Sequence, residues 1–159
     1  MALIKGTNSY VEVAEAELYF ANKPDVAAWT EASDTLKAQS LVTATSILDE
    51  LNWIGTAVSE DQPLAFPRVG SYWDPRLGIT KSFDDVDSPT RVLNATYELA
   101  YHVLNNDGLM DSTGGVIDIE VGSIKLKNII PVSLIPASVR RIINPMLRTG
   151  GRNAVWRAN

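Results

Sequence analysis

Residues 88–104 read SPTRVLNATYELAYHVL, and this stretch decides the fold that we expect. Ser88 and Pro89 are typical of a helix start, because serine caps a first turn and proline at the first helical position lacks only an N–H that has no partner there. Apolar side chains then recur in two adjacent stripes, which predicts a helix buried over much of its circumference. The stripes consist of Val92, Ala95, Leu99 and Val103 and of Leu93, Tyr97, Ala100 and Leu104.

Further helices are predicted on both sides of this central segment, because apolar residues recur there at helical spacing between clear start and stop signals. Their expected positions are residues 11–22 after a capping-box pattern at 9–12, a short piece that carries Trp29 inward, the longest segment from Ser33 or Asp34 to near Gly55, and a last helix from Pro136 that Pro145 ends or kinks.

The sequence IDIEVGSIKLK, residues 117–127, predicts a β-hairpin, because apolar and charged residues alternate on both sides of Gly122 and Ser123. A two-residue turn at these positions fixes the register of the two strands. The expected cross-strand pairs are Val121 with Ile124, Glu120 with Lys125, Ile119 with Leu126, and Asp118 with Lys127.

Between residues 55 and 88 the periodicity is lost, and we expect a long irregular loop whose aromatic residues pack on this chain or on a neighbour. The predicted fold class is therefore mostly α: a small helical bundle with one β-hairpin near residues 116–127, a long irregular loop and an extended C-terminal arm. Residues 1–148 form the single domain of this prediction, and residues 149–159 form the arm, for which a solvated chain end is the other interpretation.

Charge is unevenly distributed along the chain. Residues 1–120 carry all 19 acidic side chains and seven of the 14 basic ones, a net charge of −12, whereas residues 121–159 carry seven basic side chains and no acidic one. Two interpretations fit this pattern. Either the two parts neutralise each other within one domain, or the basic end binds another acidic surface.

The chemically active residues predict no enzyme. The chain has no cysteine and one histidine, His102, whose place between apolar stripes is typical of a structural side chain. Asp84, Asp85 and Asp87 lack the spacing of a calcium-binding loop and indicate a solvated cluster ahead of a helix. We therefore expect no catalytic residue, no cofactor and no metal site. Since no apolar stretch approaches about 18 residues, we also expect no membrane partner.

The order of these features resembles a family of small proteins encoded in the head-assembly gene clusters of tailed phages. The resemblance covers residues 9–148 and rests on order and spacing. The family often carries the label DnaT-like single-stranded-DNA-binding protein, yet it is similar to the head-to-tail adaptors, or connectors, of these phages. The segments that carry the resemblance are SYVEVAEAELYF, TLKAQSLVTATSILDELNWIG, PLAFPRVG, DSPTRVLNATYELAYHVL, VGSIKLK and IPASVRRIINPML.

The resemblance implies a structural virion protein, assembled in the host cytoplasm and located in the neck of the particle. Twelve copies are expected to form a ring that joins the portal to a tail or neck protein and lets genomic DNA pass without specific binding. The residues expected to bind the portal, all in or next to the arm, are Arg148, Arg152, Trp156 and Arg157, and those of the subunit or tail interface are Arg68, Tyr72, Trp73, Arg76, Arg140 and Arg141.

The alternative function is a single-stranded-DNA-binding replication accessory protein. Arginines and aromatic rings in the long loop, or the basic end with Trp156, have the composition that combines phosphate contact with base stacking. A sequence pI of about 4.8 argues against this function, because a dedicated DNA-binding domain usually carries a basic face.

Overall fold

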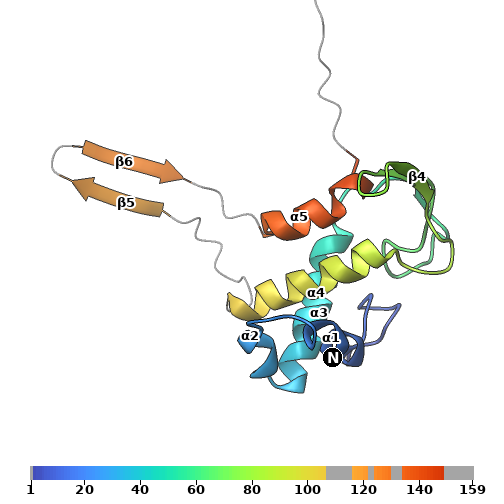
Figure 1. Cartoon of the computed structure of the whole chain (residues 1–159), viewed down its shortest axis with the longest axis horizontal. Helices are drawn as coiled ribbons and strands as arrows, with labels where there is room; N and C mark the ends of the chain where they lie inside the picture. Colours follow the sequence, from blue (N-terminus) through green and yellow to red (C-terminus); the bar gives the residue numbers. More distant parts are fainter. Residues whose placement is uncertain (1, 107–115, 122–123, 130–133, 149–159) are drawn as a thin grey trace, which may run out of the picture.

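The computed structural model describes residues 2–106, 116–121, 124–129 and 134–148, and it shows a mostly helical protein (Figure 1). The predicted fold class is confirmed. The helices are α1, Val13–Phe20; α2, Ala27–Thr30; α3, Asp34–Asp49; α4, Thr90–Asn105; and α5, Ala137–Ile143, which a 3₁₀ turn, η2 at Asn144–Met146, follows directly. None of the helices in these ranges has the length and apolar character that crossing a membrane requires.

The first helix begins later than the sequence pattern predicts. Its N-cap is Glu12, whose backbone N–H donates to the Glu15 carboxylate over 2.8 Å. Ser9, the predicted cap, is buried, and its hydroxyl donates to the carbonyl of Val11 over 2.8 Å. Tyr10 and Val11 are also buried, so the chain passes through the core before it enters α1.

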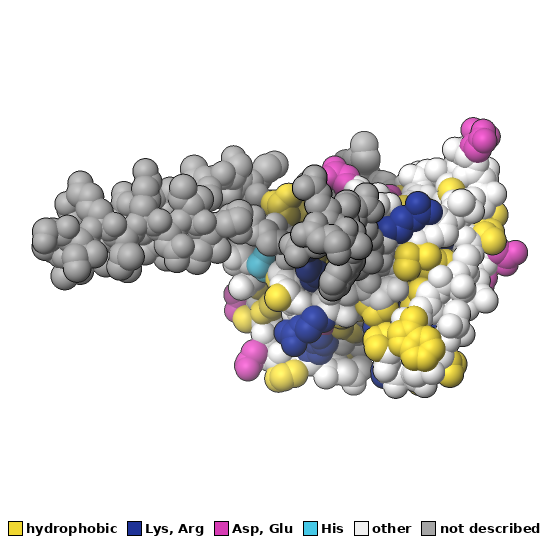
Figure 2. Space-filling model, turned by 90° about the horizontal axis from the view of Figure 1, so that it is seen from above, with side chains coloured by type: hydrophobic (Ala, Val, Ile, Leu, Met, Phe, Trp, Pro, Cys, Tyr) yellow, Lys and Arg dark blue, Asp and Glu magenta, His cyan; other side chains and the backbone are white. Residues whose placement is uncertain are grey.

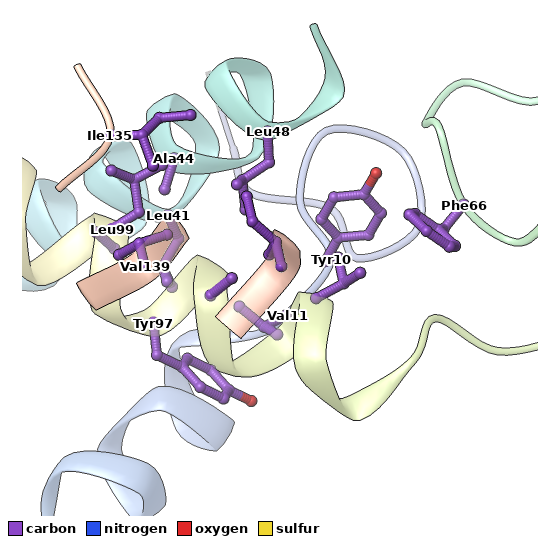
Figure 3. Packing of buried hydrophobic residues seen from close by; sticks show 14 of the residues in the cluster. Tyr10, Val11, Leu41, Ala44, Leu48, Phe66, Tyr97, Leu99, Ile135 and Val139 are labelled. Carbon is purple, nitrogen blue, oxygen red and sulfur yellow. The ribbon is translucent and has the colours of Figure 1, made fainter. Parts of the chain in front are cut away.

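The core is centred on α4, which packs against α3 and α5 (Figure 3). The stripe of Val92, Ala95, Leu99 and Val103 is buried as predicted, whereas Leu93 at the margin of the second stripe is only half-buried. Burial of a large aliphatic side chain contributes about 1.5–3 kcal/mol, so this stripe is a main source of stability. The largest fully buried apolar side chains are Trp29, Leu41, Leu48, Leu99, Ile143 and Met146.

The segment between α3 and α4 contains four short strands, where the sequence analysis predicts an irregular loop. The strands are β1, Thr56–Ala57; β2, Arg68–Val69; β3, Ser71–Asp74; and β4, Ile79–Ser82, and they form two antiparallel pairs, β1 with β2 and β3 with β4. We call residues 56–82 the strand segment. These strands are too short for periodicity to reveal them.

Aromatic packing joins the strand segment to the helices. Phe66 lies at the centre of this packing, with ring centroids 6.3 Å from Tyr10, 5.0 Å from Trp53 and 5.5 Å from Phe83. Tyr72 stacks on Phe83 with a centroid distance of 5.2 Å. The prediction that part of this region packs on its own chain is therefore confirmed.

The predicted hairpin is present as β5, Val116–Val121, and β6, Ile124–Ile129. Its register is the predicted one: Val121 pairs with Ile124, Glu120 with Lys125, Ile119 with Leu126, and Asp118 with Lys127. The turn at residues 122 and 123 lies outside the described residues. Alternation of apolar and charged residues was sufficient to set the pairing, because a slip by one residue would exchange the two faces.

The last described residues run beside the end of α3. The N–H of Ile54 donates to the carbonyl of Met146 over 2.9 Å, and the N–H of Arg148 donates to that of Asn52 over 2.8 Å. Pro145 lies in η2 and ends α5, as predicted. These contacts fix the backbone of Arg148 beside the start of the strand segment.

Candidate nucleic-acid interface

Within the described ranges, the β3–β4 hairpin presents a large aromatic ring to solvent. Neighbouring side chains of a strand point to opposite faces. Tyr72 and Asp74 are therefore buried, while Trp73 between them is 57% exposed. A turn closes the hairpin, in which Gly78 has a φ of +67° and its N–H donates to the carbonyl of Asp74 over 2.8 Å.

Trp73 pairs across the hairpin with an uncharged residue. Its cross-strand partner is Thr80, and the exposed side chains of Leu77 and Ile79 lie in the same hairpin. Figure 2 shows hydrophobic side chains reaching the surface at the end of the molecule that carries β4 in Figure 1. An indole exposed in this way is suited to stacking on a flat partner such as a nucleic-acid base.

The hairpin also carries two exposed cations, Arg76 in the turn and Lys81 in β4. Lys81 pairs across the strands with Tyr72, so it lies on the face opposite to Trp73. Neither cation belongs to an ion pair among the residues that the structure describes. The only acid of the hairpin, Asp74, is turned inward and accepts a hydrogen bond from Arg91 over 2.7 Å. The outward charge of the hairpin is therefore positive, although the whole chain is acidic.

Asp74 is held ionised by its surroundings. Burial by itself raises the pKa of this carboxyl, but hydrogen bonds from the Arg91 side chain and the Arg76 backbone N–H, with the charges of both arginines, outweigh it and keep the pKa below its usual range. Arg91 also donates to the carbonyl of Ile142 over 3.1 Å. This side chain therefore ties the hairpin, α4 and α5 together.

A cleft of about 630 Å³ lies beside the hairpin, at the start of α4. Its charges are mixed, and no three His, Cys, Asp or Glu side chains in the described parts of the chain gather as a metal site would require. Asp84 accepts from the N–H groups of Val86 and Asp87, which lowers its pKa. The cleft can therefore accept a polar group by hydrogen bonding. Its lining includes Asp74, Arg76, Lys81, Asp87, Arg91 and Asn94.

The structure corrects the predicted role of Tyr72 at a subunit or tail interface. Its side chain is 6% exposed and stacked on Phe83. The ring faces the core because it alternates with Trp73 along β3, so that only one of the two rings can lie outside. Tyr72 is therefore a packing residue, and Trp73 is the exposed ring of this hairpin.

Arg68 and Arg148, which the sequence analysis assigns to two different surfaces, lie together. The guanidinium groups of both donate to the carbonyl oxygen of Gly55, over 2.7 Å from Arg68 and 3.4 Å from Arg148. Arg68 also donates to the carbonyls of Ile54 and Ala65 over 2.9 and 3.1 Å. Sequence reasoning had no signal for this proximity, because the two residues are 80 positions apart.

The remaining predicted site residues keep their status as predictions. Arg140 and Arg141 lie in α5, where both are exposed, and Arg141 donates to the carbonyl of Ala137 over 3.3 Å. Arg152, Trp156 and Arg157 lie outside the described residues. His102 lies in the last turn of α4, and burial lowers its pKa.

A family model with the description "Putative DnaT-like ssDNA binding protein" matches residues 2–158, almost the whole chain. The chain belongs to this family. No curated protein and no solved structure matches it. The description of the family names single-stranded DNA.

Membership of this family corrects the connector identity expected from the resemblance. The description names a single-stranded-DNA-binding protein, and nothing in the match concerns a portal, a neck, a dodecamer or a virion structural role. The resemblance to the DnaT-like family is confirmed by the match. The connector role added to it is not supported, because that role rested on the order of helices and a hairpin, which many functions share. The expected partners and the expected location in the virion depend on that identity and stay untested predictions.

Sequence reasoning did not single out two residues in and behind the hairpin. Lys81 was not singled out, although it stands in the ITKS segment that becomes β4. Arg91 was treated only as part of a helix. The alternation of SYWD before a Gly-containing turn was a signal for the hairpin, but four residues are too few to distinguish it from loop sequence.

Proposed function

We propose that this protein binds single-stranded DNA through the β3–β4 hairpin. The observation that carries the proposal is the 57% exposure of Trp73 in a hairpin that also exposes Arg76 and Lys81, neither of which forms an ion pair within the described part of the chain. In this proposal a base stacks on the indole, and the two cations contact phosphates of the same strand. The function involves no chemical step.

The rigidity of the hairpin supports this role. Tyr72 and Asp74 hold β3 from the inside, through stacking on Phe83 and through the bond to Arg91. Trp73 is therefore presented on a fixed backbone, so that little conformational freedom is lost when a base stacks on it. A stacked base contributes about 1–3 kcal/mol and does so with little sequence preference.

The acidic remainder of the chain sets the expected affinity. A net charge of −5 repels the DNA backbone at long range, so the attraction has to come from local contacts. Binding should therefore be of low affinity and sensitive to salt, since each phosphate contact releases counterions. This expectation resolves the apparent conflict between a pI of about 4.8 and a nucleic-acid ligand.

The test is to measure binding of a fluorescein-labelled oligothymidylate by anisotropy, in the full chain and across a salt series. Trp73→Ala should weaken binding about 5- to 150-fold, which corresponds to one lost stacked base. Trp73→Phe keeps an aromatic face and should retain most of the affinity. Leu77→Ala is the matched control, because it removes a similarly exposed apolar side chain of the same hairpin without removing a ring.

Stability measurements separate a loss of binding from a loss of folding. Because Trp73 is more than half exposed, Trp73→Ala should change the free energy of unfolding by no more than about 0.5 kcal/mol. The proposal is wrong if the wild-type chain shows no binding at low salt, or if Trp73→Ala binds as tightly as the Leu77→Ala control. Preference for a duplex over the single strand would also overturn it.

A further inference from the structure

The carbonyl oxygen of Gly55 brings two guanidinium groups together. Arg68 approaches it from β2 and Arg148 from the residues after η2. A peptide carbonyl carries no net charge, so this acceptor satisfies hydrogen-bond donors without neutralising the two cations. None of the four ion pairs among the described residues includes either arginine. We call Arg68 and Arg148 the arginine pair.

The backbone holds the arginine pair in place. Gly55 has a φ of +79°, and a Cβ at this position would lie 2.3 Å from the carbonyl oxygen of Val69. The carbonyl of Gly55 is therefore fixed against β2, and the N–H of Arg148 is bonded to Asn52. The fold thus sets the backbone positions of Gly55 and Arg148, and the two guanidinium groups share the Gly55 carbonyl oxygen as acceptor.

No carboxylate pairs with either guanidinium within the described ranges. Burial, and then the charge of Arg148, lower the pKa of Arg68. Arg68 uses three of its five N–H donors on backbone carbonyls, and the exposed Arg148 side chain uses one. The donors that remain can reach a shared oxyanion, and a guanidinium is well suited to phosphate oxygens.

The position of the pair relative to Trp73 points to the same ligand. A Cβ on Gly70 would lie 2.9 Å from the Cα of Gly55, so these two backbones touch. Trp73 is three residues beyond Gly70, which is at most about 11 Å along an extended chain. One short strand of DNA can therefore reach both the ring and the arginine pair.

We infer that the arginine pair, Arg68 and Arg148 at the carbonyl of Gly55, is a binding site for a backbone phosphate of single-stranded DNA. This inference rests on the proposed function and adds a contact outside the hairpin. The two arginines come from distant parts of the sequence, so the site exists only in the folded chain. Arg68 also stabilises the strand segment through its carbonyl contacts, whereas Arg148 is free to act on the ligand.

The experiment is a salt series of oligothymidylate binding with Arg148→Ala in the full chain. For single strands the slope of log K against log salt changes by about 0.7 for each phosphate contact. Arg148→Ala should therefore flatten the slope by about 0.7 and weaken binding roughly tenfold at low salt. Arg148→Lys keeps the charge and should restore most of the slope. Trp73→Ala should lower the affinity with the slope unchanged.

Arg141→Ala is the matched control, because it removes the same charge from an exposed arginine in α5. It should leave the slope unchanged. Thermal unfolding of Arg148→Ala should match the wild type, since the side chain contributes one long hydrogen bond and its backbone bond remains. Arg68 is left intact, because its loss would disturb the strand segment.

The outcomes separate this inference from the proposed function. If the wild type binds and Trp73→Ala is weakened while Arg148→Ala keeps the full slope, the arginine pair is not a phosphate site, yet the proposed function stands. If the wild type does not bind at all, the proposed function fails first. A change in oligomeric state of Arg148→Ala in sedimentation, with an unchanged slope, would show that the pair binds a carboxylate of a second copy and would overturn the inference.

Discussion

The helical bundle and the strand segment bury their aromatic and aliphatic side chains by different rules. In the bundle, one face of each helix is buried, so Val92 and Leu99 are fully covered while residues on the other side are not. In the strand segment, adjacent residues can differ in burial: the side chain of Tyr72 is 6% exposed and that of Trp73 is 57% exposed. A short strand can therefore hold a ring in the core and present the next one to solvent, because its side chains alternate with a period of two, whereas a helix buries residues at a spacing of three or four.

The largest loss of stability is expected for Phe66→Ala, which tests whether the bundle and the strand segment share one core. Because Phe66 contacts the rings of Tyr10, Trp53 and Phe83, its loss should lower the free energy of unfolding by about 3–5 kcal/mol, similar to Leu99→Ala in the bundle at about 2–5 kcal/mol. Urea unfolding followed by far-UV circular dichroism and by tryptophan fluorescence measures both variants. If the two probes separate only in Phe66→Ala, the regions unfold independently and do not share one core.

A smaller effect is expected at Gly55, where the strand segment meets the end of the bundle. Gly55→Ala requires an unfavourable backbone conformation and brings a Cβ to 2.3 Å from the carbonyl of Val69, so we expect a loss of about 1–3 kcal/mol or more. Gly78→Ala is the control, since it has a similar positive φ but open space around it, and about 1 kcal/mol is expected. Equal losses in chemical denaturation would contradict the close approach.

The smallest effect concerns Asp74 and the dependence of stability on pH. Its pKa is lowered in the folded state, so its ionised form stabilises the fold fully above the ordinary value of 3.8, and this contribution is lost as the pH falls through the lower folded-state pKa. Asp74→Asn removes that titration, and its stability should fall less on acidification than that of the wild type. Thermal midpoints at about pH 6 and about pH 3 test this. Parallel losses in both proteins would show that other groups dominate.

Much of the bundle could be predicted from the sequence, because helical periodicity is a local property. The stripe of α4, the inward position of Trp29, the cap at Ser33 and the stop at Pro145 all follow from residues within a few positions of each other. The register of β5 and β6 was predicted for the same reason. The strand segment escaped prediction because two- and four-residue strands carry too little pattern.

The candidate site was predicted only in its composition. The sequence indicated arginines and aromatic rings between residues 68 and 76, but it did not tell which ring is buried and which exposed. Arg68 and Arg148 were expected on two different surfaces, because they lie in parts of the sequence that differ in charge. The ion pair of Asp74 with Arg91 also joins elements that periodicity treats separately.

The sequence by itself determined where helices and the β5–β6 hairpin form, that the chain lacks thiol chemistry, and that positive charge gathers towards its end. Only the tertiary structure decided that Trp73 faces solvent and that two distant arginines share one carbonyl. The physical reason is that propensity and periodicity act over a few residues, whereas burial and electrostatic environment depend on which distant segments the fold brings into contact.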